Sequence, residues 1–130
     1  REFTEPFVTG PFADMTALQA LAAEHGLKIT RGGRFYHLIG AGQDKGTAVR
    51  TAREIFAGCL GRQPVAIGIG DSENDLPMLA QVDIPVLIPR PDGTSLDLRL
   101  PRMVIAGDPG CRGWNDAMEK ILDELATKAD

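Results

Sequence analysis

The sequence has few cysteines and no long apolar run, and each shortage excludes a class of protein. The chain of 130 residues holds only Cys59 and Cys111, without C-x-x-C spacing, so neither a disulfide framework nor a zinc site is indicated. We expect both to be reduced, buried thiols. No stretch approaches the roughly 20 apolar residues that cross a bilayer, and the N-terminus has no charged-then-apolar signal pattern. We therefore expect a cytoplasmic protein with no membrane partner.

A cluster of basic residues is also missing. The chain has 14 Lys and Arg against 18 Asp and Glu, which gives a net charge of −4. No group of these cations could follow a phosphodiester backbone, so nucleic acid is not an expected partner.

Residues 1–42 have the pattern of a small α+β element. Residues 14–25 place apolar side chains at helical spacing after Asp14, a residue type that caps helices. Residues 27–40 then show two extended runs around a Gly-Gly turn, which predicts a hairpin. The segment FTEPFVT before the helix is a candidate edge strand.

From residue 43 onward, strand and helix patterns alternate. A helix is expected from Lys45 to about Phe56, closed by Gly58, and the apolar runs QPVAIGIG, IPVLIP and RMVIAG are typical of buried parallel strands. The last helix carries one apolar stripe, made of Trp114, Met118, Ile121, Leu122 and Leu125. The pattern predicts an α/β fold with a mainly parallel sheet.

An acidic loop, GDSENDLPML at residues 70–79, follows the first of these strands. In an open parallel sheet, ligands bind beyond the carboxyl ends of the strands, where Asp71 stands. Mg²⁺ takes one or two carboxylates together with substrate phosphate, so Asp71 alone could serve as the ligand from this loop. Helix capping by Ser72, with Asn74 and Asp75 in the first turn, is the competing structural explanation.

Lys45 favours a ligand over capping. A lysine at the start of a helix lies at the end of the dipole that disfavours positive charge, so helix stability explains it poorly. An anionic ligand such as a phosphate explains it better.

The order of DKGTAV, an apolar strand and GDSENDLPML resembles the second half of the haloacid dehalogenase-like phosphatases. With REFTEPF, GGRFYHLIG, IPRPDG and GDPGCRGWNDA, nearly the whole chain is similar to the mannosyl-3-phosphoglycerate phosphatases of that superfamily. The resemblance implies the second half of a Rossmann-like core in residues 43–130 and a remnant of an α/β cap in residues 1–42. It also implies Mg²⁺-dependent hydrolysis of a phosphorylated sugar through an aspartyl-phosphate.

Carried over by motif position, the resemblance assigns a role to each residue of the two motifs. Lys45 would be catalytic and steady the transferring phosphoryl group, and Asp71 would bind Mg²⁺. Ser72, Asn74 and Asp75 would support that metal and phosphate shell.

The resemblance also assigns substrate contacts to the cap segment. The residues expected to contact the sugar phosphate are Glu5, Arg34 and His37. An arginine can donate two hydrogen bonds to a carboxylate such as that of a glyceryl group. Half of the side chains in alternating strands face solvent, which is the competing explanation. Mannosyl-3-phosphoglycerate is the expected substrate, with its glucosyl analogue or another sugar phosphate as alternatives, because one hydroxyl separates the sugars.

The nucleophile motif of this superfamily, D-x-D-G-T, is absent from the chain, and RPDGT at residues 90–94 is a turn with Arg90 in the nucleophile's place. We interpret the chain as a fragment that could self-associate through its incomplete core. A non-catalytic module that binds Mg²⁺ and phosphate is the alternative. A phospho-acceptor receiver domain is disfavoured, because receivers carry their acidic pair early in the chain and their lysine late, whereas here Lys45 precedes Asp71.

The isolated chain is therefore expected to lack Mg²⁺-dependent phosphatase activity, because it supplies no aspartate nucleophile. Phosphate release from a sugar phosphate measures this. Turnover that survives repurification and disappears in Asp71→Asn would contradict the expectation.

Overall fold

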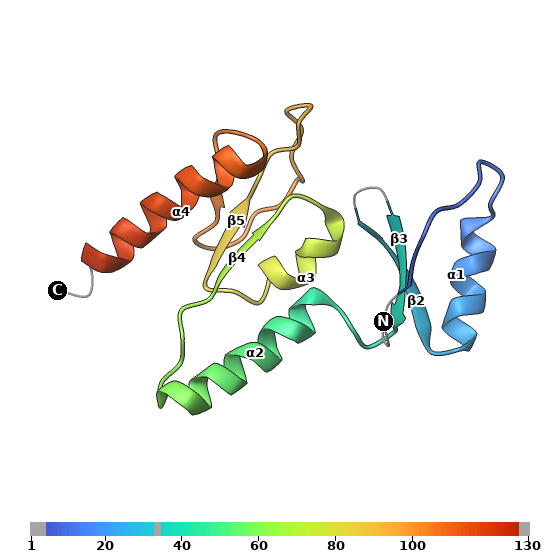
Figure 1. Ribbon diagram of the computed structural model, residues 1–130, viewed down its shortest axis with the longest axis horizontal. Coiled ribbons are helices and arrows are strands. Elements are labelled where there is room, and N and C mark those ends of the chain that lie inside the picture. The colour runs from blue at the N-terminus through green and yellow to red at the C-terminus, as the bar shows by residue number, and fades with distance from the viewer. Residues whose placement is uncertain (1–4, 33–34, 128–130) are drawn as a thin grey trace.

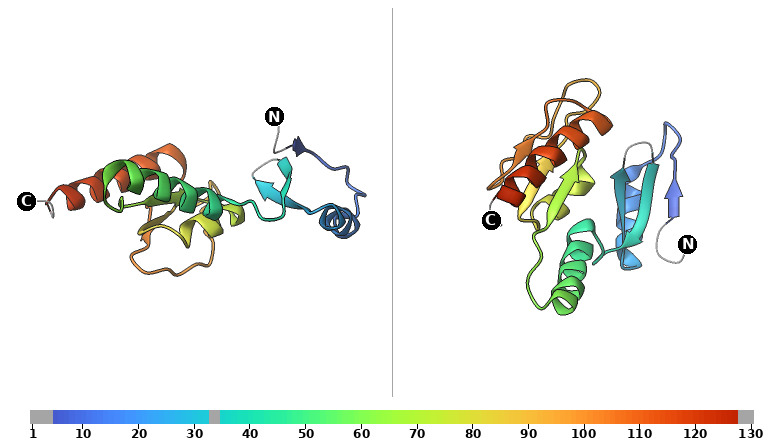
Figure 2. Two further views of the ribbon diagram at one scale, coloured as in Figure 1. Left: turned by 90° about the horizontal axis from the view of Figure 1, so that it is seen from below. Right: turned by 60° about the vertical axis from the view of Figure 1, so that its left-hand side comes forward.

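Two three-stranded sheets organise the described part of the protein, and they lie side by side (Figure 1, Figure 2). The computed structural model describes residues 5–32 and 35–127. The elements of the first part are β1 (Glu5–Phe7), α1 (Met15–Glu24), β2 (Leu27–Gly32) and β3 (Phe35–Gly40). Those of the second part are α2 (Lys45–Leu60), β4 (Ile67–Gly70), the 3-10 turn η1 (Glu73–Asp75), α3 (Leu76–Leu79), β5 (Ile84–Leu87), β6 (Val104–Ile105) and α4 (Gly110–Thr127).

The first sheet is antiparallel, in the order β1-β3-β2, and α1 packs against it. The helix predicted after Asp14 is confirmed, and the Asp14 carboxylate accepts hydrogen bonds from the backbone N–H groups of Thr16 and Ala17 at 3.0 Å each. The predicted hairpin is also confirmed as β2 and β3. The candidate edge strand is confirmed as β1.

The second sheet is parallel, in the order β4-β5-β6. Every residue of β5 is buried, and α4 covers this strand through Ala117 and Ile121. The predicted fold class is confirmed, because a parallel sheet with helices stands beside an α+β piece (Figure 1). The division at residues 42 and 43 into cap and core stays a prediction.

The predicted end of α2 is wrong. The helix continues beyond Phe56 to Leu60, and Gly58 lies inside it. Gly61 ends the helix, because its φ of 64° is left-handed, a conformation that glycine adopts without a steric penalty.

The predicted apolar stripe of α4 is only partly buried. Trp114 and Leu122 are 49% and 54% exposed, whereas Gly113, Ala117 and Ile121 are buried. Gly113 and Ala117 are small, and a Cβ at Gly113 would stand 3.2 Å from the Cβ of Ala106 after β6 and would clash with the carbonyl oxygen of Asp108 just before the helix. Close approach by small side chains therefore selects the buried face.

Several other large apolar side chains are exposed as well. On α2 they are Ile55, Phe56 and Leu60, and Val65 before β4 is exposed too.

The two cysteines, Cys59 and Cys111, are free thiols as expected, but both are exposed, which corrects the expectation that they are buried. None of the helices in residues 5–32 and 35–127 combines the length and apolar character that crossing a membrane requires.

Gly46 lets α2 pack directly on the start of α3, and its replacement by alanine should be destabilising. A Cβ at Gly46 would lie 2.4 Å from the Pro77 carbonyl oxygen. We expect Gly46→Ala to lower the free energy of unfolding by about 1–3 kcal/mol, as overpacking does. Urea denaturation measures this.

Gly58→Ala is the matched control in the same helix, since a Cβ there has no heavy atom within 4 Å. It should stabilise by roughly 0.5–1 kcal/mol, because alanine suits a helix interior. Equal effects of the two substitutions would show that contact with Pro77 is not the cause.

Candidate functional site

The loop after β4 wraps around one buried carboxylate. Asp75 is 4% exposed. Its Oδ2 atom accepts hydrogen bonds from the backbone N–H groups of Asp71 and Ser72, both at 3.1 Å, and from the Ser72 hydroxyl at 2.9 Å. These contacts hold the loop at the carboxyl end of β4, where the sequence places it.

Lys45, the first residue of α2, forms an ion pair with Oδ1 of Asp75. The side chain of Lys45 is 50% exposed, so part of it remains accessible beside the pair. The structure thus brings the lysine motif and the acidic loop into direct contact. The anion that Lys45 meets in the structure is the Asp75 carboxylate, which explains a lysine at the unfavourable end of the helix dipole.

The ion pair also sets the ionisation of Asp75. Burial raises the pKa of this carboxyl, but the hydrogen bonds from Lys45, Ser72 and the backbone N–H groups outweigh it and hold the pKa below its ordinary value. Asp75 is therefore a stable carboxylate, and its charge is satisfied within the protein.

Asp71 differs from Asp75, although both lie in the same loop. Its side chain is exposed, and no hydrogen bond or ion pair within the described ranges occupies its carboxylate. Its backbone N–H is fixed by Asp75. The carboxylate thus stands at the strand end in a held loop, accessible to a ligand.

Asn74 and Ser72 complete the loop. The Ser72 hydroxyl donates to the Asn74 Oδ1 atom at 2.7 Å as well as to Asp75. The other end of the Asn74 side chain approaches Gly32 of β2, where an added Cβ would meet Nδ2 at 2.9 Å. Asn74 therefore lies between the acidic loop and the first sheet.

A cleft of about 740 Å³ separates the first sheet from α2 and η1. It brings together three predicted site residues, His37 of β3, Lys45 of α2 and Asn74 of η1. The rest of its lining is Lys28, Thr30, Ile39, Gln43, Asp44, Thr47, Ala48, Glu73 and Pro77. Asp71 is not part of this lining.

Lys28 and Thr30 are site residues that the motifs did not identify. In the antiparallel pairing of β2 and β3, Thr30 lies opposite His37 and Lys28 lies opposite Ile39. Residues at alternate positions share one face of a strand, so all four face the cleft. The alternation of side chains along the two strands, counted from His37 with the register of the hairpin, could have identified Lys28 and Thr30.

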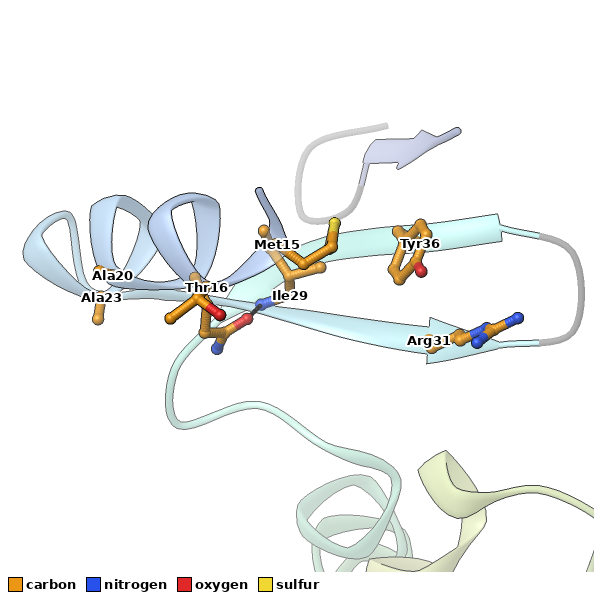
Figure 3. Close-up of a pocket in the computed structure, with 8 residues that line it drawn as sticks. Met15, Thr16, Ala20, Ala23, Ile29, Arg31 and Tyr36 are labelled. Carbon is orange, nitrogen blue, oxygen red and sulfur yellow. Dashed lines mark hydrogen bonds between the residues drawn. The ribbon is translucent and has the colours of Figure 1, made fainter. Parts of the chain in front are cut away.

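The opposite face of this sheet is occupied by α1 and carries a different recess (Figure 3). Its volume is about 600 Å³, and Gln19 of the helix crosses it to accept a hydrogen bond from the Ile29 N–H at 3.2 Å. None of the predicted site residues whose side chains the structure describes lines this recess. It is therefore separate from the cleft.

The structure does not test the two remaining predicted substrate residues, Glu5 and Arg34. Glu5 begins β1, paired with Leu38 at the outer edge of the sheet, and its role stays a prediction. Arg34 lies outside the described residues.

The donor set fits Mg²⁺ only in part. The described ranges contain no group of three or more His, Cys, Asp or Glu residues that could hold a metal. Asp71 supplies one exposed carboxylate, and Mg²⁺ commonly takes only one or two from the protein and completes its shell with phosphate and water. The loop therefore fits a partial magnesium site with Asp71 as its ligand.

Comparisons with known proteins agree with the motifs. No family model matches the chain. The chain is 47% identical over 125 residues to a glucosyl-3-phosphoglycerate/mannosyl-3-phosphoglycerate phosphatase of Persephonella marina, covering 96% of this chain and 46% of that protein. It is 40% identical over 124 residues to a protein of the same name from Methanococcoides burtonii, covering 94% of this chain and 45% of that protein.

The expected resemblance to these sugar-phosphoglycerate phosphatases is confirmed, and the chain spans less than half of the length of these curated relatives. The crystal structure of Thermoplasma acidophilum 0175 has the same fold, with a TM-score of 0.73 at 22% identity. That match covers 92% of this chain and 50% of the other.

Asp75→Asn should destabilise the protein by about 1–3 kcal/mol at neutral pH, because it removes the charge that pairs with Lys45 and turns one of the two buried acceptor oxygens into an NH2 donor. The wild-type contribution of Asp75 is present above its unfolded-state pKa, near 3.8. It is lost as the pH falls through the lower pKa of the folded state. Urea denaturation across this pH range measures both effects.

Asp116→Asn on the exposed surface of α4 is the control and should change stability little. The difference in stability between wild type and Asp75→Asn should shrink on acidification below pH 3.8. A difference that stays constant with pH would contradict the assigned ionisation of Asp75.

Proposed function

We propose that this chain carries the lysine and the acidic loop of a Mg²⁺-dependent phosphatase that acts on a phosphorylated sugar. The observation that carries the proposal is the arrangement of three groups at one strand end. The half-exposed Lys45 and the buried Asp75 form an ion pair there, and Asp71 remains exposed beside it. The names of the relatives support this reading.

In this proposal Lys45 has two functions. It neutralises Asp75, and its half-exposed ammonium lines the cleft, where it would attract and orient a phosphate. Asp75 keeps the lysine in place and fixes the backbone of Asp71. Asp71 would hold Mg²⁺, which supplies neutralisation of the phosphate oxygens when it is bound.

The attacking carboxylate is outside residues 1–130 in this proposal. Phosphatases of this kind split hydrolysis into two displacements through an aspartyl-phosphate, which requires an aspartate in line with the phosphate. The D-x-D-G-T motif that would carry this aspartate is absent from the sequence. Isolated residues 1–130 would therefore bind without turnover.

The proposed substrate is a sugar linked to 3-phosphoglycerate, mannosyl or glucosyl, as named for the relatives. The cleft presents hydroxyl, imidazole, amide and ammonium groups from Thr30, His37, Asn74 and Lys28. These groups suit the hydroxyls of a sugar, which both donate and accept hydrogen bonds. Arg34 and Glu5 remain proposed substrate residues.

The exposed apolar side chains support one further proposal about partners. Four large apolar side chains are 49% to 60% exposed, and such surface favours association with another chain or segment: Ile55, Phe56, Leu60 and Trp114.

We assign the activity to the cytoplasm, where exposed thiols such as Cys59 and Cys111 stay reduced.

The test compares Asp71→Asn and Lys45→Ala in the protein encoded by the full reading frame. Each should lower kcat/KM for the sugar phosphoglycerate by about 10³, since each removes charge stabilisation of the transferring phosphoryl group. Phosphate release is measured with mannosyl-, glucosyl- and other sugar phosphates over a titration of Mg²⁺.

Glu54→Gln, an exposed substitution on α2, is the control and should keep wild-type activity. Wild-type turnover that persists in Asp71→Asn would exclude the proposed magnesium ligand. Binding of Mg²⁺ and phosphate without turnover in the full product would instead identify a non-catalytic module.

A further inference from the structure

We infer that Arg31 and Arg90 form a subsite for the carboxylate of the substrate. The inference rests on the proposed function and deepens it, because it assigns the second anionic group of a phosphoglycerate. Neither arginine belongs to the lysine motif or the acidic-loop motif.

The two arginines line one cavity of about 360 Å³, together with Ser72 and Glu73 of the acidic loop. Arg31 is near the end of β2 in the first sheet. Arg90 follows β5, and the backbone N–H of Ile88 in this segment donates to the carbonyl of Gly70 at 2.9 Å. The cavity therefore joins the two sheets beside the loop that holds Asp71.

Neither guanidinium is neutralised by a neighbour. Within residues 6–32 and 35–127, no carboxylate lies within 4.0 Å of Arg31 or Arg90, Glu73 included. Asp92, close to Arg90 in sequence, accepts hydrogen bonds from the backbone and hydroxyl of Thr94, and the charge of Arg90 acts on it without a salt bridge. The positive charge of both arginines is thus available to a ligand.

Arg31 lies where this cavity meets the recess beside α1, which Arg31 also lines together with Tyr36. Its Cζ atom lies 5.8 Å from the centroid of Tyr36 on β3, and both side chains are visible at the strand ends (Figure 3). A cation near an aromatic ring is attracted by its π-electrons. This contact leaves the N–H groups of the guanidinium free to bind a planar anion.

The chemistry of the cavity favours a carboxylate over a phosphate. A guanidinium can donate two parallel hydrogen bonds to a carboxylate. Glu73 lines the same cavity, and its negative charge opposes a dianionic phosphate more strongly than a monoanion. In the proposed function, the phosphate is already assigned to the region of Lys45 and Asp71.

The test uses the full reading-frame protein with two substrates, the sugar 3-phosphoglycerate and p-nitrophenyl phosphate, which has no carboxylate. Arg31→Gln and Arg90→Gln should each raise KM for the first substrate about tenfold and leave kcat within about twofold. KM for p-nitrophenyl phosphate should not change. Arg90→Lys should recover part of the loss, because an ammonium keeps the charge without the fork of N–H groups.

Two further variants sharpen the result. Arg99→Gln removes an exposed arginine outside the cavity and should leave both KM values unchanged. Glu73→Gln should lower KM for the carboxylate substrate severalfold, since it removes a negative charge that repels the negative carboxylate of the substrate. A variant that fails to fold would instead show a lower apparent kcat for both substrates.

The outcomes separate this inference from the proposed function. Equal KM increases for both substrates would show that the arginines bind the phosphate, and unchanged KM values would show that they bind neither anion. Either result overturns the carboxylate subsite while the phosphatase activity stands. If the wild-type protein has no turnover, calorimetric titration with D-glycerate and with inorganic phosphate decides: glycerate binding that is weakened about tenfold in both arginine variants supports the subsite, and its absence overturns it.

Discussion

The ion pair between Lys45 and Asp75 is the constraint on which the rest of the site depends. A buried carboxylate is costly unless its charge is balanced and its oxygens are hydrogen-bonded. Asp75 meets both conditions, with the lysine at one oxygen and the loop's own donors at the other. The same contacts join α2 to the end of β4. Because Asp75 takes these donors, the carboxylate of Asp71 is left exposed in a loop that is otherwise held in place.

Two glycines make this pairing sterically possible. A Cβ at Gly70 would lie 2.4 Å from the Cβ of Asp75, and one at Gly46 would meet the carbonyl of Pro77. Both positions therefore need glycine for close approach rather than for an unusual backbone conformation. The DKG and GDSEND motifs thus combine charged residues with the small residues that let the charged ones meet.

The site is shared between the two sheets, since each supplies only part of it. The second sheet positions the acidic loop, whereas the first contributes the polar face that includes Thr30 and His37. Asn74 lies against Gly32 between them. Large apolar side chains stay exposed on α2 and α4, and the chain spans less than half of the length of its curated relatives.

The sequence by itself determined most of the elements and the order of the two motifs, because periodicity, capping and short charged motifs are local signals. The capping of α1 by Asp14 and the position of Asp71 after β4 could be read in this way. Tertiary structure decided the rest. Small residues rather than Trp114 face the core from α4, because helix approach depends on the neighbouring backbone. Arg31 and Arg90 are distant in sequence, and only the packing of two sheets places them on one cavity.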